Sequence, residues 1–213
     1  MDLSSPISSL IPTLDAAVLE VLSGTESALG VSQIHRLTRR GARSGIHRVL
    51  DRLTEHGLVT AEGTNLGYVY RLNRDHVLAE SVLSAVGARA EFMNRLKQAC
   101  EALSPNVISA ALFGSTARRE SGAQSDVDLL LIIKDDSVRT DTWERQVRAL
   151  EDRVVAWTGN QLEFLTLNRD HLKEAIRSGE TIVVSWQEDA LTLAGEPLPT
   201  LIHALRASEE GDQ

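Results

Sequence analysis

Two apolar runs joined by a polar loop constrain this chain more than any other feature. The runs, Val107 to Phe113 and Val127 to Ile133, each have the length of a buried β-strand. The first run ends abruptly at Gly114-Ser115. Glycine lets a backbone approach a bound group closely, and a helix beginning at Ser115 would direct its N–H groups at an anion. The pattern therefore predicts a phosphate-binding corner after the first strand.

Two acids stand at the entrance of the second run. Asp126 and Asp128 are two residues apart, so on a strand their carboxylates point to the same face. Carboxylates that close together repel each other unless a cation or a proton lies between them. Magnesium prefers oxygen ligands and binds through one or two carboxylates together with substrate phosphates. A phosphate-binding corner facing such a pair predicts phosphoryl or nucleotidyl transfer.

This pattern resembles the nucleotidyltransferases of the DNA polymerase β superfamily. Their signature is an apolar strand, Gly-Ser, a loop and Asp-x-Asp, and here ten residues separate Ser115 from Asp126. The resemblance covers roughly residues 90–190. It includes the small members of the superfamily, among them antibiotic nucleotidyltransferases and the antitoxin halves of some toxin–antitoxin pairs.

The resemblance implies roles for individual residues. Asp126 and Asp128 would be catalytic metal ligands, and Glu163, on the next predicted strand, would be the third acid. A solvent-facing glutamate is the alternative for Glu163, because apolar residues flank it on both sides. The family more often has the shorter aspartate at this position. The nucleotide-binding residues would be Gly114, Ser115, Arg118 and Ser125. Arg118 is preferred to Arg119 as the phosphate clamp because it lies about one turn beyond Ser115 on the same helix face.

The same resemblance implies cofactors and substrates. Mg²⁺ or Mn²⁺ would be the metal, and a nucleoside triphosphate, with ATP expected, would be the donor. The acceptor would be a hydroxyl on a protein, an RNA or a small molecule. Two alternatives stay open, namely a transcription regulator that senses nucleotide without turnover and an antitoxin that modifies or binds a toxin.

The N-terminal part reads as a separate domain. Apolar spacing predicts helices at 14–22, 33–38 and after Ser44 up to Gly57, followed by a hairpin that ends at Leu72. This order resembles a winged helix–turn–helix domain. Between Val31 and Arg52 six arginines face a single acid. Double-stranded DNA is the partner this implies, and the alternative is a solvated basic face used for dimerisation or docking. The residues expected at DNA are Arg39, Arg40, Arg43, His47, Arg48, Tyr68 and Arg71.

Composition narrows the setting. The net charge of −8 argues against a protein that coats nucleic acid indiscriminately. No apolar run approaches the ~20 residues of a membrane span, so no membrane association is expected. The N-terminus lacks the basic start and apolar core of a signal peptide. Cys100 is the single cysteine, so an internal disulfide is impossible and a cytoplasmic location is expected.

The expected fold class is α+β. A winged helix–turn–helix domain would precede a polymerase-β-like domain with a mixed sheet, flanking helices and a C-terminal helix. We expect an N-terminal arm at 1–13, the first domain at 14–78 and the second at 79–213. A homodimer is consistent with this, because helix–turn–helix proteins commonly dimerise to read paired half-sites. We expect a helix at 76–103 that joins the two domains and packs on the second. Within the second domain we expect helices at 142–157, 169–178 and 197–207 and a third strand at 161–167, with the run 181–186 open between strand and helix.

Overall fold

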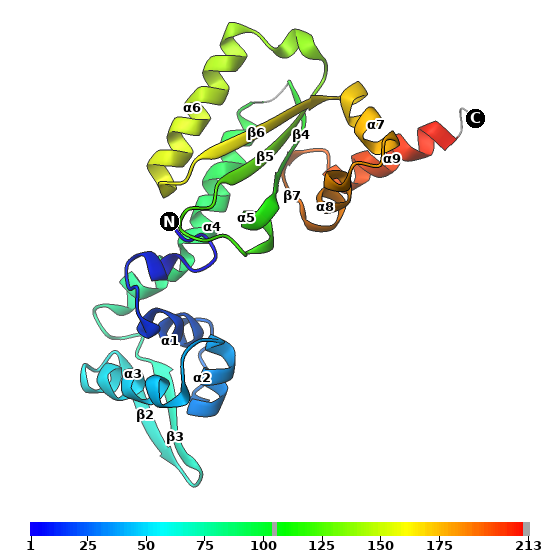
Figure 1. Ribbon diagram of the computed structural model, residues 1–213. Coiled ribbons are helices and arrows are strands. Elements are labelled where there is room, and N and C mark those ends of the chain that lie inside the picture. Colours follow the sequence, from blue (N-terminus) through cyan, green and yellow to red (C-terminus); the bar gives the residue numbers. More distant parts are fainter. Residues whose placement is uncertain (104–105, 211–213) are drawn as a thin grey trace. The chain divides into compact units, whose positions relative to one another are not determined.

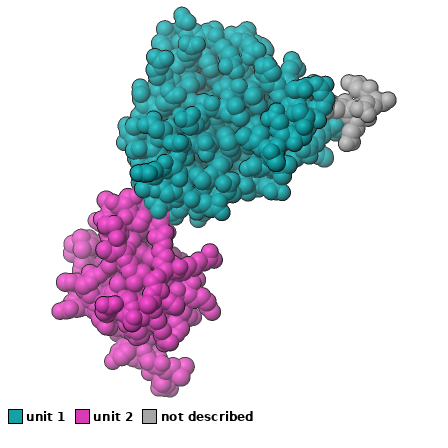
Figure 2. Space-filling model, viewed as in Figure 1, with its two compact units in different colours: residues 1–4, 90–213 teal, residues 5–89 magenta. Residues whose placement is uncertain are grey.

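The computed structural model describes residues 1–103 and 106–210. It divides into two compact units (Figures 1 and 2). The smaller unit contains residues 5–89, and the larger contains residues 1–4 and the described residues from Ala90 onward. Each unit has its own apolar core. No helix in the described ranges is both long and apolar enough to cross a bilayer.

The smaller unit consists of short helices and an antiparallel sheet of strand order β1-β3-β2. Its helices lie close to where apolar spacing placed them, because Ile46, Leu50 and other residues at helical spacing are buried together. Strand β1 is an addition that the sequence did not reveal. The elements are η1 (Pro6–Ser9), α1 (Leu14–Ser23), β1 (Leu29–Gly30), α2 (Val31–Thr38), α3 (Arg43–Glu55), β2 (Val59–Thr64) and β3 (Gly67–Leu72).

The N-terminal segment differs from the loose arm expected at residues 1–13. Leu3 is fully buried in the core of the larger unit, and Ile7 is buried in the core of the smaller one. The amino group of Met1 donates to the carbonyl of Thr158 at 2.8 Å and to Oδ1 of Asn160 at 2.9 Å. Burying the side chains of Leu3 and Ile7 stabilises this segment against the cores, although most of its other residues are polar.

The larger unit is built on a four-stranded sheet of order β6-β5-β4-β7. Strand β4 is antiparallel to β5 and to β7, whereas β5 and β6 are parallel. The sheet is therefore mixed, and its flanking helices complete the expected α+β arrangement (Figure 1). Helix α4 (Ala79–Glu101) belongs to this unit from Ala90 onward, and its earlier residues belong to the smaller unit. The other elements are β4 (Val107–Phe113), α5 (Gly114–Arg118), β5 (Val127–Ile133), η2 (Asp136–Val138), α6 (Asp141–Thr158), β6 (Leu162–Asn168), α7 (Arg169–Arg177), α8 (Thr181–Asp189), β7 (Leu191–Gly195) and α9 (Leu198–Glu210).

Strand β5 lies at the centre of this core and is buried on both faces. Leu129 and Leu131 pack in the cluster that includes α4 and α6, whereas Leu130 and Ile132 pack in the cluster that includes α7, α8 and α9. Alternate residues of a strand point to opposite faces, so a continuous apolar run is required here. Cys100 of α4 belongs to the first cluster, and burial raises the pKa of its thiol to about 12.

Two features of the C-terminal region could not be read from the sequence. The run 181–186 forms part of helix α8, which resolves the alternative left open. Strand β7 follows α8 and pairs antiparallel with β4, and Ala110 of β4 aligns with Ala194 of β7. Its five residues are too few and too weakly patterned to predict a strand alone, and pairing with β4 supplies the missing hydrogen bonds.

Gly195 should be essential to this edge of the sheet. Its φ is +76°, and a Cβ added there would overlap the carbonyl oxygen of Ile108. We expect Gly195→Ala to lower the free energy of unfolding by about 1–3 kcal/mol, because the left-handed backbone and the close approach both exclude a side chain. Gly122→Ala is the matched control, since nothing lies within 4 Å of its added Cβ. Equal urea midpoints for the two variants would contradict this expectation.

Candidate active site

The Gly-Ser corner lies where β4 passes directly into α5. Gly114 has φ of +69°, a left-handed conformation that favours glycine. A Cβ added to Gly114 would overlap Oδ2 of Asp128, so the carboxylate lies directly against this glycine. Helix α5 has only five residues. A phosphate at this corner would therefore depend on individual N–H groups rather than on a long helix dipole.

The three predicted acids come from neighbouring strands and share a face. Asp128 on β5 aligns with Phe113 of β4 and with Glu163 of β6. Directly paired residues point to the same side of a sheet, and Asp126, two positions before Asp128, follows the same alternation. Asp128 is half-buried, while Asp126 and Glu163 are exposed. The structure thus brings the three acids to one end of the β5–β6 pair.

Electrostatics at Asp128 reflect this crowding. Burial raises the pKa of the Asp128 carboxyl above its ordinary value, and the charges of Asp126 and Glu163 raise it further. The positive charge of Arg118 opposes the rise. An ionised Asp128 is therefore disfavoured unless additional positive charge is supplied.

The acids suit a divalent cation only in part. Their oxygens are the hard ligands that Mg²⁺ and Mn²⁺ accept, and a cation there would oppose the burial and the like charges that raise the pKa of Asp128. No group of three or more His, Cys, Asp or Glu side chains with metal-binding spacing occurs among residues 1–103 and 106–210. Carboxylates repel one another, so a bound cation would stabilise a closer approach of these side chains. The arrangement fits an ion that also takes water and phosphate oxygens as ligands.

Arg118, the predicted phosphate clamp, ends α5 and is held by two acids. Its Nε donates to Oε2 of Glu120 at 2.9 Å, and its Nη1 lies 3.5 Å from Oδ2 of Asp189. Arg119 follows in a left-handed conformation and is exposed. Ser115 is partly exposed within α5. Arg118 and Ser115 are therefore both on the short element that adjoins Asp128.

Ser125 has a structural part in the loop before the acids. Its Oγ accepts from the backbone N–H of Gly122 at 2.8 Å, and its carbonyl accepts from Nδ2 of Asn160 at 2.8 Å. Thr116 donates from Oγ1 to the carbonyl of Asp126 at 3.2 Å. Thr116 and Asn160 are both buried, and the sequence carried no signal for either. They position the start of β5 and with it Asp126.

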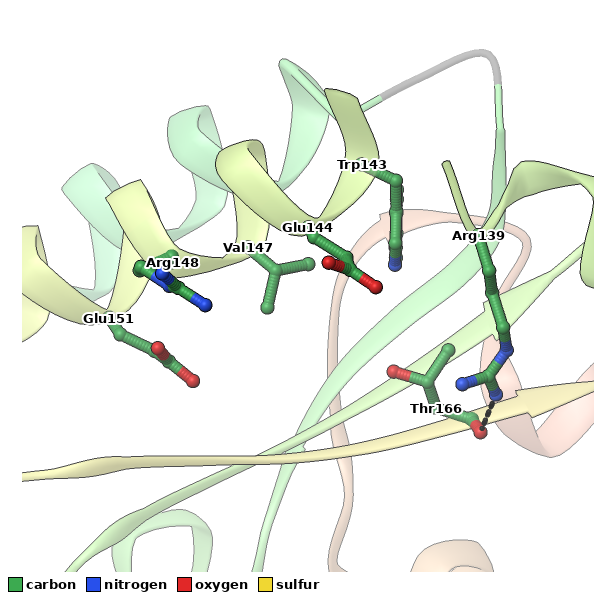
Figure 3. A pocket seen from close by; sticks show the side chains of 7 residues that line it. All are labelled: Arg139, Trp143, Glu144, Val147, Arg148, Glu151 and Thr166. Carbon is green, nitrogen blue, oxygen red and sulfur yellow. Dashed lines mark hydrogen bonds between the residues drawn. The ribbon is translucent and has the colours of Figure 1, made fainter. Parts of the chain in front are cut away.

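A cavity of about 280 Å³ between α6 and the edge strand β6 is distinct from the acids (Figure 3). Its lining contains Arg139, Trp143, Glu144, Val147, Arg148, Glu151 and Thr166. Nη2 of Arg139 donates to the carbonyl of Thr166 at 2.9 Å, which covers part of the open edge of β6. Neither the acids nor the Gly-Ser corner line this cavity, so the chemistry expected from the sequence lies elsewhere.

In the smaller unit, the residues expected at DNA are all exposed. Arg39 ends α2 in a left-handed conformation, Arg43 begins α3, and Arg48 lies in the same helix. These three arginines form no ion pair within the described ranges. Acids follow on α3, where Asp51 and Glu55 line a cavity of about 310 Å³ together with Tyr68 of the hairpin. Positive charge is therefore concentrated around the α2–α3 turn and the first half of α3.

Removing the charge of Asp128 should stabilise the metal-free protein. A carboxyl whose pKa is raised by folding favours the folded state below its unfolded pKa, and this contribution is lost as the pH rises through the folded pKa. With EDTA present, we expect Asp128→Asn to have a higher Tm than wild type at pH 7–8, with the difference shrinking below about pH 4. Asp152→Asn, an exposed acid on α6, serves as the control. A lower Tm for Asp128→Asn at neutral pH would show that ionised Asp128 is not disfavoured.

Part of this chain matches a family model of known proteins. Residues 94–188 match the family model described as "Polymerase beta, Nucleotidyltransferase". No protein of curated function matches the sequence. A toxin–antitoxin crystallised with AMP-PNP is 16% identical, with 57% of this chain and 89% of the other covered and a TM-score of 0.36. A mutant of the toxin–antitoxin MntA-HpeT has 14% identity, coverage of 57% and 88% and a TM-score of 0.35.

A putative nucleotidyltransferase from Sulfolobus solfataricus is 16% identical, with 49% of this chain and 85% of the other covered and a TM-score of 0.25. The TM-scores of these three structures are all below 0.5, so the structural likeness carries no argument beyond the family match. The matched segment contains the Gly-Ser corner and all three acids. Residues 94–188, just under half of the chain, are therefore the part that matches the polymerase β nucleotidyltransferase family.

Proposed function

We propose that the larger unit transfers a nucleoside monophosphate from a triphosphate, with ATP as the expected donor, to a hydroxyl acceptor. The observation that carries this proposal is the half-buried Asp128 carboxylate, which lies against Gly114 and shares its sheet face with Asp126 and Glu163. Positive charge is needed there, and a nucleotide bound with Mg²⁺ or Mn²⁺ brings it.

Each residue has a part in this reaction. Backbone groups of Gly114 and the hydroxyl of Ser115 bind the terminal phosphates, and Arg118 neutralises charge on them. Asp126 and Asp128 would hold the metal, which would supply charge that polarises the phosphate oxygens. Glu163 is a further ligand or the base that takes the acceptor proton. Ser125 has an indirect part, because its hydrogen bond with Gly122 shapes the loop that leads to Asp126.

The bond changes follow from the chemistry of phosphoryl transfer. The acceptor oxygen forms a bond to the α-phosphorus while the bond from that phosphorus to the β-phosphate oxygen breaks, and pyrophosphate leaves. Catalysis of such a step consists of positioning and charge neutralisation. The acids and Arg118 supply both at one end of the sheet.

The transfer proposal is tested by incubating the protein with Mg²⁺ and each of four α-labelled triphosphates. We expect label to move to the protein itself, a partner protein, RNA or a small hydroxyl compound, whichever is the acceptor. Asp128→Ala should reduce transfer at least about 100-fold, because a metal ligand is lost. Asp152→Asn should retain full activity. Unchanged transfer by Asp128→Ala would refute the assignment of the acids.

A second candidate function is nucleotide sensing without turnover. It is favoured by the absence, within residues 1–103 and 106–210, of three acids already gathered with metal-binding spacing. Such a regulator would bind triphosphate but transfer no label to any acceptor. An antitoxin role differs in its acceptor, which would be a partner toxin, and the labelling experiment distinguishes it.

We also propose that the smaller unit is a winged helix–turn–helix domain that binds double-stranded DNA. Support comes from the exposed arginines around the α2–α3 turn, from His47 in α3, and from Tyr68 and Arg71 on the hairpin. Asp51 and Glu55 would repel phosphates. Contact is therefore expected through the first half of α3 and the turn before it, the part of a recognition helix that reaches base edges.

The DNA proposal makes a separable prediction. Arg43→Ala combined with Arg48→Ala should weaken binding to promoter DNA about tenfold or more at low salt. The slope of log K against log salt should fall by about 1 for each phosphate that the variant no longer neutralises. Arg145→Ala with Arg148→Ala on α6 changes the charge equally and should leave binding unchanged. Nucleotide transfer should survive in both double variants, and its loss in the first would contradict separate roles.

A further inference from the structure

Helix α8 ends beside the Gly-Ser corner and supplies an acid that the proposed chemistry does not use. Oδ2 of Asp189, the last residue of α8, lies 3.5 Å from Nη1 of Arg118. Glu120 accepts from Nε of the same guanidinium at 2.9 Å. Nη2 takes part in neither contact. The planar guanidinium of Arg118 is therefore contacted at Nε by Glu120 and at Nη1 by Asp189, and Nη2 is the nitrogen outside these two contacts.

The position of Asp189 is fixed by packing around the corner. Trp186, three residues earlier on α8, is buried at 1% exposure. Its ring meets that of Phe113 edge-on, with centroids 6.2 Å apart and an interplanar angle of 80°. Phe113 immediately precedes Gly114 and aligns with Asp128. A shift of α8 would thus move both the corner and the acid that holds Arg118.

Arg118 lies on the same short element as the Gly-Ser corner. Helix α5 runs from Gly114 to Arg118, and a Cβ added to Gly114 would overlap Oδ2 of Asp128. A triphosphate bound between Gly114 and the acids would lie within reach of the same guanidinium. The orientation of Arg118 therefore matters for nucleotide binding.

We propose that Asp189 is a positioning residue for the nucleotide, holding Arg118 so that its remaining N–H groups face the phosphates. The inference rests on the proposed transfer function and deepens it. Two carboxylates that grip one guanidinium remove rotamer freedom before the nucleotide arrives, which lowers the entropy lost on binding. The alternative is that Asp189 competes with phosphate for Arg118. The geometry favours positioning, because the 3.5 Å between Oδ2 of Asp189 and Nη1 is longer than a normal hydrogen bond, so the acid does not hold this nitrogen tightly against a phosphate.

The test compares Asp189→Asn with Glu188→Gln, which removes the neighbouring acid of the same helix. For Asp189→Asn we expect the KM for triphosphate to rise roughly two- to fivefold, the effect of one exposed ion pair, with kcat within about twofold of wild type. Binding of a non-hydrolysable triphosphate with Mg²⁺, measured by calorimetry, should weaken by the same factor. Glu188→Gln should match wild type, and Asp189→Glu should restore part of the affinity.

A double variant shows whether Asp189 acts through Arg118. Arg118→Ala should weaken triphosphate binding by itself, and adding Asp189→Asn should then cause no further loss. Additive losses would indicate a general structural role and overturn the inference, as would an unchanged or lowered KM in Asp189→Asn. If wild-type protein neither binds nor transfers nucleotide, the proposed function fails together with this inference. If it does both while Asp189→Asn equals wild type, only the inference fails.

Discussion

The contact between the Asp128 carboxylate and the backbone of Gly114 is the constraint on which the rest of the site depends. It exists because Gly114 has no side chain and adopts a left-handed conformation that ends β4 and begins α5. The same contact keeps Asp128 half-buried beside two other acids, so its charge is disfavoured in the protein alone. Positive charge near Asp128 would stabilise its ionised form. The backbone geometry is thereby linked to the proposed binding of nucleotide and metal.

The packing of the sheet fixes the position of Asp128. Strand β5 is buried on both faces and flanked by β4 and β6, so Asp128 cannot shift along the strand without moving a leucine or isoleucine out of a core. Buried hydrogen bonds from Thr116 and Asn160 hold the loop that leads into β5. The acids are thereby placed by packing and backbone bonds rather than by attraction for one another.

Much of the site was predictable because it is local. Gly114, Ser115, Asp126 and Asp128 lie within fifteen residues, and the alternation of a strand is enough to orient the two aspartates. Glu163 could be chosen only through the expected third strand, and the register of β6 with β5 then aligned it with Asp128. The pairing of Arg118 with Asp189 was not predictable, since seventy residues of chain separate them and α8 itself was ambiguous. The buried N-terminal Leu3 and strand β7 also depend on distant partners.

By itself the sequence determined the α+β class, the helices at 14–22 and 142–157, the two central strands and the residues of the loop that joins them. Periodicity, glycine corners and paired carboxylates are properties of short segments, so they can be read without knowledge of any tertiary contact. Only the tertiary structure decided that the three acids lie on one face of the sheet. It also decided that the Ser125 side chain bonds within its own loop and that α8 places Asp189 beside Arg118. Those outcomes depend on strand register and helix packing, where residues far apart in the chain compete for the same space.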